Sequence, residues 1–585
     1  MRRTARALTA AVMSSALVAL GCGGNAPANQ QGTTHSSGGS AGMSAAASGA
    51  GGGAGKLGAA GTASGAGGSG AGGTNATGGS GAFAGMSAGG AATAGGGMSS
   101  GAGAAAGMSS AGAAAGGAGS GNTAGAGPLG SLTLSGLMIE ANPNMTISCF
   151  VSWTTTEAAS SEVDFGEADY QFRIKDATPT MQHRVLVIGM HAQKMYKIKA
   201  VSTTASATGS LEGTFTTGML PAGLPLPMLT ASDFADSQVG WTLTNIMPAT
   251  SGPAIIVMYD QNGVPVWYYV HGTHADSRGD VDNELLPGNT VLVGPTSGEP
   301  PREVDLSGKV IWEGPTQGTT QMMTHYAGKT TTGDYLLNYE LDKAVTNGST
   351  KIDNQLLEEV SPAKDVVWSW KLFDHIQPAG NREELCHGNM LIDDEAAGFM
   401  YYNCRFLGLF KIDRTSGDIV WRLGGNYDTT SIGPGDFTFD PPESQFSDAH
   451  EPELHADGTI LLYDNGGYSQ AGGFGGGQGT QNFHSRVVEY QVDETKKTAT
   501  RTWEFPGTFD VDTWYKNTWY SPYWGDADVL PNGNVLVTAP TKSSSASTRI
   551  FEVTRAGKVV WELTEPPNNG SFKAQRFAPL AEAIQ

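Results

Sequence analysis

The stretch Val304–Gly314, VDLSGKVIWEG, decides the fold. A polar start, a Ser-Gly turn and an apolar run that ends in tryptophan predict a β-hairpin. The same unit recurs through the rest of the chain after about residue 224. The tryptophans that end the copies are Trp267, Trp312, Trp368, Trp421, Trp503 and Trp561.

The spacing of these copies indicates the architecture. They follow one another at roughly 45–60 residues, with one longer interval, which is the period of a β-propeller blade. Strand signals such as LLPGNTVLVG and HADGTILLYDNG lie between them. We therefore predict an all-β chain with a six-bladed β-propeller over residues 219–575. A seven-bladed ring that uses another set of strands agrees less well with six copies.

A second β region precedes the propeller. Residues 129–218 hold short runs of alternating apolar and polar residues, among them MTISCFVSWTT and KMYKIKAVST. Six or seven short strands in so small a region predict a β-sandwich, with Trp153 as the core anchor. The pattern resembles a fibronectin type III-like module.

The N-terminus carries export signals. Three arginines precede an apolar run, Ala7–Leu20, that is too short to remain as a membrane span. It ends in Ala-Leu-Gly-Cys, which resembles a bacterial lipobox with Ala19 at the usual leucine position. We predict a lipoprotein signal peptide over residues 1–22, lipidation at Cys22 and a protein anchored to the cell envelope by its lipid. An ordinary secretory signal is the alternative.

Residues 23–128 differ from the rest in composition. They are almost only Gly, Ala, Ser, Thr and Met, with few aromatic and charged residues. Such a segment cannot bury enough apolar surface to offset its ordering entropy. We predict a disordered tether that holds the folded part away from a membrane.

The charge of the folded part excludes some partners. The chain has a formal net charge of −21, and the tether contributes almost none of it. This argues against nucleic acid as a partner, because nucleic acid requires clustered Lys and Arg. A small anionic substrate responds to the local electrostatic field and not to the net charge, so the net charge does not exclude such a substrate.

The chain has four cysteines, Cys22, Cys149, Cys386 and Cys404. With Cys22 assigned to the lipid, Cys386 and Cys404 lie on strands predicted to be neighbours, so we expect them to form a disulfide in an exported protein. Cys149 lies in an apolar strand and is predicted to be a buried thiol. The cysteines do not suggest a metal site, because none of them are in CxxC spacing.

The stretch Glu384–Gly425 holds the most suggestive polar groups. His387 and Asn389 are two residues apart and would share one face of an extended strand. Arg405 follows on the next apolar run and would lie beside them after a hairpin. Imidazole, amide and guanidinium on one face predict a pocket for an oxyanion.

Polar residues stand a few positions before the inner-strand turn in successive blades. The innermost strands line the central channel of a propeller, so equivalent positions should converge near its axis. His325, His387 and His450, from three consecutive blades, would then meet beside Arg405. The full series is Asp280 or Asp282, His325, His387, His450 and Asp526.

Two chemistries could use three imidazoles. They could hold zinc, but a neighbouring arginine is electrostatically unfavourable for a metal, and the sequence indicates no nearby carboxylate to orient the ligands. Transfer of an anionic group fits better, with one neutral histidine as nucleophile and the other groups holding oxygen atoms. We therefore expect neither a metal nor a cofactor.

These motifs together resemble the bacterial arylsulfate sulfotransferase family. The family pattern of His, a two-residue step to Asn and an Arg after the next strand is present as His387, Asn389 and Arg405. A later histidine before a strand ending Asp-Asn-Gly is present as His450, and an earlier one before a Gly-turn strand fits His325. His450 stands in DAHEPEL, whereas Gln-His-Asp is the commoner context in the family.

The resemblance implies a mechanism. His450 would attack an aryl sulfate, a phenol would leave, and a second phenol would take the sulfuryl group from a sulfohistidine without a nucleotide sulfate donor. His325, His387 and Arg405 would serve as acid/base and oxyanion groups, with Asn389, Tyr326 and Trp524 in contact with substrate. A non-catalytic propeller that binds a ligand or protein partner is one alternative, and a quinone-dependent dehydrogenase is another.

Overall fold

The structure is a computed structural model in which the N-terminal part lies outside the described residues. The predicted signal peptide with Cys22 and the predicted tether belong to that part, and Asp280 also lies outside the described residues, between residues 274 and 282. The described residues are 129–248, 252–274, 282–296, 299–316, 321–347, 350–378, 384–425, 435–466, 485–506, 520–521, 523–540 and 547–584.

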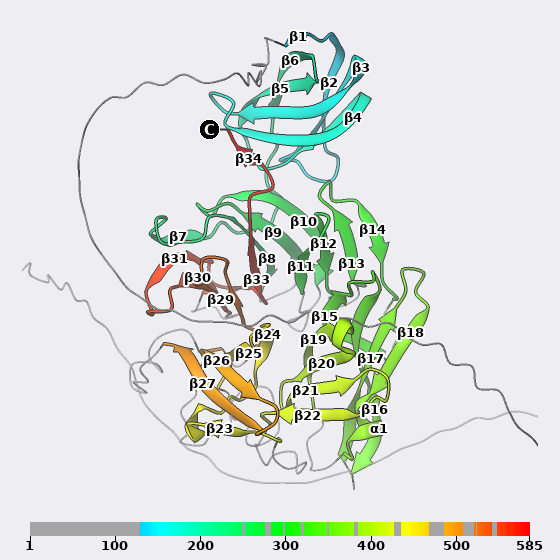
Figure 1. Cartoon of the computed structure of the whole chain (residues 1–585), viewed down its shortest axis with the longest axis vertical. Coiled ribbons are helices and arrows are strands. Elements are labelled where there is room, and N and C mark those ends of the chain that lie inside the picture. Colours follow the sequence, from blue (N-terminus) through cyan, green and yellow to red (C-terminus); the bar gives the residue numbers. More distant parts are fainter. Residues whose placement is uncertain are drawn as a thin grey trace, which may run out of the picture. The chain divides into compact units, whose positions relative to one another are not determined.

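Six separate antiparallel sheets follow one another along the chain after residue 228 and form the six-bladed β-propeller that the tryptophan repeat predicts (Figure 1). In chain order, their strands are β8 (Trp241–Pro248), β9 (Gly252–Tyr259) and β10 (Pro265–His274); β11 (Asn283–Leu286), β12 (Thr290–Val293), β13 (Arg302–Asp305) and β14 (Val310–Glu313); β15 (Gln321–Lys329), β16 (Tyr335–Asn347), β17 (Thr350–Val360) and β18 (Val366–Lys371); β19 (Gly388–Asp394), β20 (Phe399–Cys404), β21 (Gly408–Asp413) and β22 (Ile419–Leu423); β24 (His450–Leu454), β25 (Thr459–Asp464), β26 (Arg486–Asp493) and β27 (Thr498–Phe505); and β28 (Asp526–Val529), β29 (Val535–Ala539), β30 (Arg549–Val553) and β31 (Val559–Thr564).

The ring is closed from both ends of the propeller segment. β33 (Ala574–Phe577), near the end of the chain, pairs with β8 and so becomes the innermost strand of the first blade, where β32 (Asn569–Gly570) also pairs with β8. β7 (Met228–Ser232) precedes the first blade but pairs with β31 at the outer edge of the last one. A short strand, β23 (Thr438–Asp440), covers the outer edge of β27 in the fifth blade.

The repeated tryptophans connect neighbouring blades. Each repeat forms the last two strands of its blade in chain order, and its tryptophan lies on the second of these two strands, on the outer side of the blade. Four of the indole N–H groups donate to a carbonyl in the corresponding turn of the next blade, and the last of the four reaches the first blade. The bonds are Trp267 to Leu306 O at 2.8 Å, Trp368 to Arg414 O at 3.0 Å, Trp503 to Arg555 O at 2.9 Å and Trp561 to Gln261 O at 2.8 Å.

The N-terminal strands form a separate seven-stranded sheet that the last residues of the chain complete. Two long strands pair over different lengths with different neighbours, which bends the sheet on itself, and Trp153 is buried in its core. The likeness to a fibronectin type III module stays a prediction. The strands are β1 (Gly130–Ser131), β2 (Leu134–Ala141), β3 (Cys149–Gly166), β4 (Phe172–Val187), β5 (Met195–Thr203), β6 (Ala207–Thr216) and β34 (Glu582–Ala583).

Helices are few and short in the described part of the chain. They are α1 (Leu372–His375) and the 3-10 segments η1 (Glu395–Ala397) and η2 (Pro442–Ser444). None of the described helices has the length and apolar character needed to span a membrane.

The predicted disulfide is confirmed. Cys386 and Cys404 are bonded, with their Cα atoms 4.7 Å apart. Cys404 ends β20, and its register partner on β19 is Gly388, so the bridge joins the start of an innermost strand to its neighbour. Cys149 is free and buried, as its apolar strand predicts.

Candidate active site

One innermost strand from each blade surrounds the axis of the propeller. These strands are β11, β15, β19, β24, β28 and β33. Around the ring, β11 contacts β15, β15 contacts β19, β19 contacts β24 and β24 contacts β28. The three predicted histidines stand in the middle of β15, immediately before β19 and at the first residue of β24, so three adjacent innermost strands carry them.

His325 and His387 contact each other directly. Their Nε2 atoms are 3.0 Å apart, and their ring centroids are 4.9 Å apart. Both residues adopt positive φ, 44° for His325 and 54° for His387. L-residues rarely occupy this region, and backbone strain of this kind concentrates at functional sites.

A carboxylate determines which nitrogen of His387 carries hydrogen. Glu384 Oε2 lies 3.4 Å from Nδ1 of His387, and an ionised carboxylate can only accept. Nδ1 therefore carries the hydrogen, Nε2 of the neutral ring is an acceptor, and His325 Nε2 donates to it. Burial lowers the pKa of His387, which outweighs the opposite effect of Glu384 and keeps the ring neutral near pH 7.

His450 is held in one tautomer by Asn465. The Nδ1 atom lies 2.7 Å from Asn465 Oδ1 and 3.1 Å from the carbonyl of Asp448. Asn465 cannot turn its amide over, because its Nδ2 donates to the carbonyls of Ser521 at 2.9 Å and Trp524 at 2.7 Å. Nδ1 of His450 is therefore the donor, and its Nε2 keeps a lone pair that meets only a long contact, 3.3 Å, from the backbone N–H of Trp524.

His450 is also kept uncharged. It is 1% exposed. Burial, and next the positive charge of Arg405, lower the pKa of His450 well below its usual value. A buried neutral imidazole whose Nε2 lone pair accepts only a long hydrogen bond can act as a nucleophile without a base to deprotonate it.

Arg405 lies beside His387, as the predicted hairpin requires. Its backbone N–H donates to the carbonyl of His387 at 3.2 Å. Its guanidinium is 8% exposed, stacks at 4.9 Å from the ring centroid of Phe406 and lies 3.9 Å from Asp448 Oδ2. Together, His325, His387, His450 and Arg405 offer an anion N–H donors and one positive charge, which the carboxylate of Asp448 partly offsets. We call these four residues the histidine layer.

Asn389 does not share a face with His387 in the way that strand alternation predicts. The register of β19 against β20 shifts between Gly388 and Met390, which is a β-bulge at Asn389. Asn389 is fully buried, and its amide donates to Ala449 O at 3.0 Å and accepts from Asn403 at 2.7 Å. Its side chain therefore fixes the residue just before His450.

Two aromatic residues accompany the histidines, and the sequence indicated only one of them. Trp524, with φ of 62°, packs against Phe572 with centroids 6.3 Å apart. Phe572 also lies 5.9 Å from the ring of His325 and 6.2 Å from that of His450. Phe572 precedes β33, the strand that the C-terminus supplies, and no histidine or Gly-turn in the sequence marks that strand. Tyr326 instead lines a cavity formed by the following residues of these strands.

Asp282 and Asp526, predicted at equivalent positions of two other blades, associate with a lysine. Asp282 Oδ1 lies 2.7 Å from Lys573 Nζ. Asp526 Oδ2 accepts from the backbone N–H of Ala574 at 3.2 Å. Lys573 was not recognised in the sequence for the same reason as Phe572.

Metal ligation by the histidines finds no support in their geometry. Among the described residues, the one group of His, Cys, Asp or Glu ligand atoms that lie within 4.8 Å of one another is Glu340, Asp353 and Glu384. The expectation that no carboxylate stands near the histidines was wrong, because Glu384 contacts His387. The reason is that Glu384 belongs to a segment before β19 whose position the strand pattern does not predict.

Solved structures with similar coordinates are distant. They include a europium-containing methanol dehydrogenase (13% identity, 64% of this chain and 77% of that chain, TM-score 0.29). Others are the Myceliophteria thermophila Cps50 (Swd1) β-propeller domain (12%, 59% and 89%, TM-score 0.31) and a quinonprotein alcohol dehydrogenase-like protein from Bacteroides thetaiotaomicron (10%, 78% and 98%, TM-score 0.24). At these TM-scores the likeness carries no argument about function.

A family model gives the decisive comparison. The search of curated proteins returned no match. The model "Arylsulfotransferase (ASST)" matches residues 232–572, which is more than half of the chain and contains the whole histidine layer. The chain therefore belongs to the arylsulfotransferase (ASST) family.

Proposed function

We propose that this protein transfers a sulfuryl group from an aryl sulfate to a phenol through a covalent sulfohistidine at His450. The observation that carries the proposal is the fixed tautomer of His450. Asn465 accepts from Nδ1, so the lone pair of the ring stands on Nε2, where the backbone N–H of Trp524 lies 3.3 Å away. Family membership supports arylsulfotransferase activity in general, and the residues below supply the finer assignment.

In the first half-reaction, Nε2 of His450 attacks the sulfur of the aryl sulfate. The Nε2–S bond forms while the bond from sulfur to the aryl oxygen breaks, and the phenolate leaves with the bonding electron pair. Nδ1 keeps its hydrogen, so the modified ring is cationic and Asn465 Oδ1 stabilises it.

The leaving oxygen must be protonated, because free phenols titrate near pH ~10. The His325–His387 pair is assigned as the acid in its singly protonated, imidazolium form: it gives the added proton to the phenolate, and both rings are then neutral and joined by the contact between their Nε2 atoms. In the second half-reaction, a phenol oxygen attacks the sulfur, the S–Nε2 bond breaks, and the pair takes back the phenol proton. The two halves together consume and release no net proton.

Arg405 is assigned to the sulfuryl oxygens. Its buried guanidinium offers N–H donors in a planar fork that suits a tetrahedral oxyanion. In the transition state of sulfuryl transfer, the three sulfuryl oxygens carry negative charge. A fixed cation beside them therefore lowers the barrier to the transfer. Trp524 and Phe572 contact each other next to His450 and are assigned to the aryl ring. Asn389 is a positioning residue, since its amide is used by Ala449 and Asn403.

Trapping the intermediate tests the proposal. The full chain is exposed briefly to 4-nitrophenyl sulfate without acceptor, quenched at alkaline pH, digested and mapped by mass spectrometry. We expect a burst of 4-nitrophenol of about one equivalent per active site and a sulfuryl group on the peptide with His450. Steady turnover should then require added phenol.

Three outcomes would contradict the proposal. Turnover that is equally fast without acceptor means hydrolysis, and no release of 4-nitrophenol from a folded protein means that the ring binds ligands without catalysis. A sulfuryl group on His325 or His387 would move the nucleophile to that residue.

We also propose that the protein is exported and anchored by a lipid on Cys22, with residues 23–128 as the tether between the anchor and the folded part. The disulfide Cys386–Cys404 supports an oxidising compartment. Expression of the wild-type chain and Cys22→Ala, followed by detergent-phase partition and mass spectrometry, tests this. The wild type should enter the detergent phase and the variant should not.

A further inference from the structure

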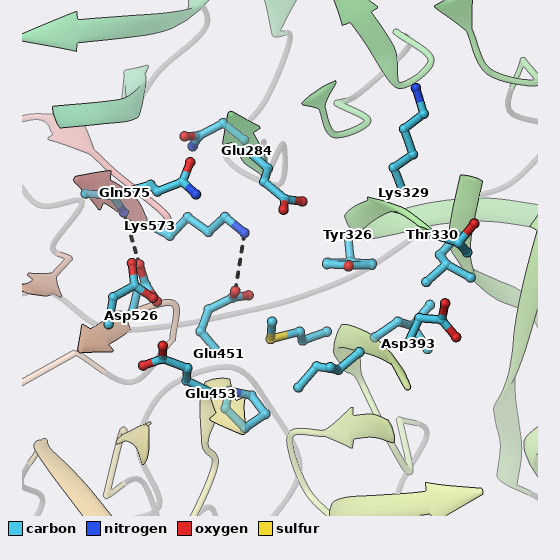
Figure 2. A pocket seen from close by; sticks show the side chains of 18 of the residues that line it. Glu284, Tyr326, Lys329, Thr330, Asp393, Glu451, Glu453, Asp526, Lys573 and Gln575 are labelled. Atoms are coloured by element: carbon cyan, nitrogen blue, oxygen red, sulfur yellow. Dashed lines mark hydrogen bonds and ion pairs between the residues drawn. The ribbon is translucent and has the colours of Figure 1, made fainter. Parts of the chain in front are cut away.

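A cavity of about 290 Å³ lies among the innermost strands, next to the histidine layer in sequence but with different chemistry. Its wall includes Tyr326, Glu451, Asp526 and Lys573, each one or two residues after His325, His450, Trp524 and Phe572. Figure 2 shows carboxyl groups and Lys573 gathered on one side of Tyr326. We call this space the acidic cavity.

Several charges that line the acidic cavity already have partners. Lys329 Nζ lies 2.6 Å from Glu303, which does not line it, and Asp393 is bonded to Arg414. Lys573 is left to face the remaining carboxyl groups. It lies 2.7 Å from Asp282 and 3.5 Å from Glu451. The carboxyl groups that share this single ammonium are Asp282, Glu284, Glu451, Asp526 and Asp528.

The electrostatics agree with an excess of negative charge. Burial alone lowers the pKa of Lys573, but the surrounding carboxylates, Asp282 first, outweigh it and raise the pKa. Burial raises the pKa of Asp528 to about 7 and that of Glu451 to about 8. Both groups thus hold protons near pH 7, although such groups are ionised in water, mainly because burial disfavours their charged forms and also because neighbouring carboxylates repel them.

Buried oxygen atoms without partners give a second, independent indication. Glu451 is 3% exposed, and within the described residues its Oε1 has no hydrogen-bond partner. The same holds for Oδ1 of Asn283, which is 1% exposed and also lines the acidic cavity. Buried acceptors are normally paired, so these atoms indicate a missing donor.

The rest of the lining limits which donor can fill the space. It includes the apolar side chains of Leu336, Met390 and Ile392 and the ring of Tyr326. The carboxyl oxygens of the acidic cavity do not converge as a metal would require, because the one trio of close ligand atoms in the described residues lies elsewhere. A cavity lined by both carboxyl groups and apolar and aromatic side chains suits a cation that has an apolar body.

We propose that the acidic cavity binds an organic ammonium ion, with its charged nitrogen among Glu451, Asp528 and Glu284 and its apolar body against Met390, Ile392 and Tyr326. The bound ammonium donates to the unpartnered oxygen of Glu451 and displaces protons from the neighbouring carboxyl groups. This site is separate from the sulfuryl-transfer chemistry and does not depend on it.

Isothermal titration of the full chain with 2-phenylethylamine tests the proposal. This probe has no phenol hydroxyl to accept a sulfuryl group, and 2-phenylethanol and 3-phenylpropionate are its neutral and anionic counterparts. We expect the amine to bind, to release protons into the buffer at pH 7 and to bind at least about tenfold more tightly than the alcohol. The anion should not bind.

Variants locate the site. Glu451→Gln and Asp528→Asn should each weaken binding of the amine about tenfold and reduce the proton release. Asp365→Asn removes an exposed carboxylate outside the acidic cavity and should change neither quantity. Circular dichroism confirms that each variant is folded, and if Glu451→Gln does not fold, Asp528→Asn decides.

Three results would overturn the proposal: equal affinity for the amine and the alcohol, unchanged affinity in both cavity variants, or displacement of the amine by millimolar Ca²⁺ with tighter binding of the metal. The last result would assign the acidic cavity to a divalent ion. None of the three bears on the sulfohistidine, which is tested by trapping with 4-nitrophenyl sulfate.

Discussion

The histidine layer and the acidic cavity are built by adjacent residues of the same strands, yet they hold opposite chemistry. β15 contributes His325 to one and Tyr326 to the other, and β24 contributes His450 and then Glu451. In the histidine layer, burial and Arg405 lower the pKa of His450. In the acidic cavity, burial raises the pKa of Glu451 to about 8.

The difference teaches that burial acts in one direction on bases and acids alike, toward their neutral forms. A neutral imidazole gains a lone pair and becomes a nucleophile. A neutral carboxyl group holds a proton that a cation can displace. The same physical effect therefore supports the proposed attacking group in the histidine layer and the proposed cation site in the acidic cavity, and the substitutions below separate the two.

The largest effect is expected for His450→Ala. Removing the nucleophile should lower 4-nitrophenyl sulfate turnover by at least about 10⁴-fold, because the remaining groups act on a reaction that now lacks its covalent step. Thermal unfolding should change little. His455 directly follows the last residue of β24, so His455→Ala is the matched control, and its turnover should stay at the wild-type level. Activity retained in His450→Ala would remove the proposed role of this residue.

Arg405→Lys comes next. Lysine keeps the positive charge but loses the planar fork, so we expect a loss of about 10²- to 10³-fold in kcat. Arg501→Lys, on β27 and paired with Glu504, is the control and should behave as wild type. If Arg405→Lys were as active as wild type, charge without directed hydrogen bonds would suffice and the fork would not matter.

Asn465→Asp sharpens the comparison further, since it places a carboxylate beside the neutral ring of His450. The new carboxylate still accepts from Nδ1 of His450, so the tautomer is kept. Its negative charge favours the imidazolium and raises the pKa of His450, so the acid limb of the kcat/KM profile should move to higher pH by about one unit or more. A purely structural role for Asn465 would lower the rate at every pH and leave the limb in place. Asn465→Leu, which cannot accept, should lower kcat by about 10²-fold.

The smallest effect concerns stability. The histidine layer and the acidic cavity should change the free energy of unfolding in opposite directions as the pH rises. For the histidines, whose pKa is lowered on folding, stability is present above the unfolded pKa near 6.5 and is lost as the pH falls below it. For Asp528 and Glu451, whose pKa is raised, stability is present below their unfolded values and is lost as the pH rises toward about 7 and about 8.

Thermal unfolding between pH 5 and pH 9 measures this balance. Replacing both carboxyl groups, in Glu451→Gln with Asp528→Asn, should flatten the alkaline decline and leave the acid decline unchanged. The single variant Asp365→Asn should reproduce the wild-type curve. An alkaline decline that stays equally steep in the double variant would mean that other groups control it.

Much of the fold could be predicted because the sequence signals that specify it lie within short segments of the chain. Each tryptophan repeat contains its own turn, and the indole of Trp267 reaches the next copy through a single hydrogen bond to Leu306. Six copies therefore specify six blades. The histidines could be predicted for the same reason, since each stands just before or within a strand whose place in the blade is set by a nearby Gly turn.

The remaining residues depend on pairing across the whole chain, which leaves no local signal. β33 pairs with β8, so Phe572 and Lys573 enter the channel from a segment more than 300 residues away from their neighbours in the first blade. Asn465 belongs to the LLYDNG strand end that the family resemblance quotes, so a signal for it was present in the sequence. Its partnership with His450 follows only from the pairing of β24 with β25.

The closure by β33 makes the last residues of the chain a condition for everything that happens at the axis. A polypeptide that stops before residue 570 lacks the innermost strand of the first blade, the ring of Phe572 beside two histidines and the ammonium of Lys573. Truncation from this end is therefore expected to disturb the histidine layer and the acidic cavity together. In the function proposed above, sulfuryl transfer would then require the chain at least through β33.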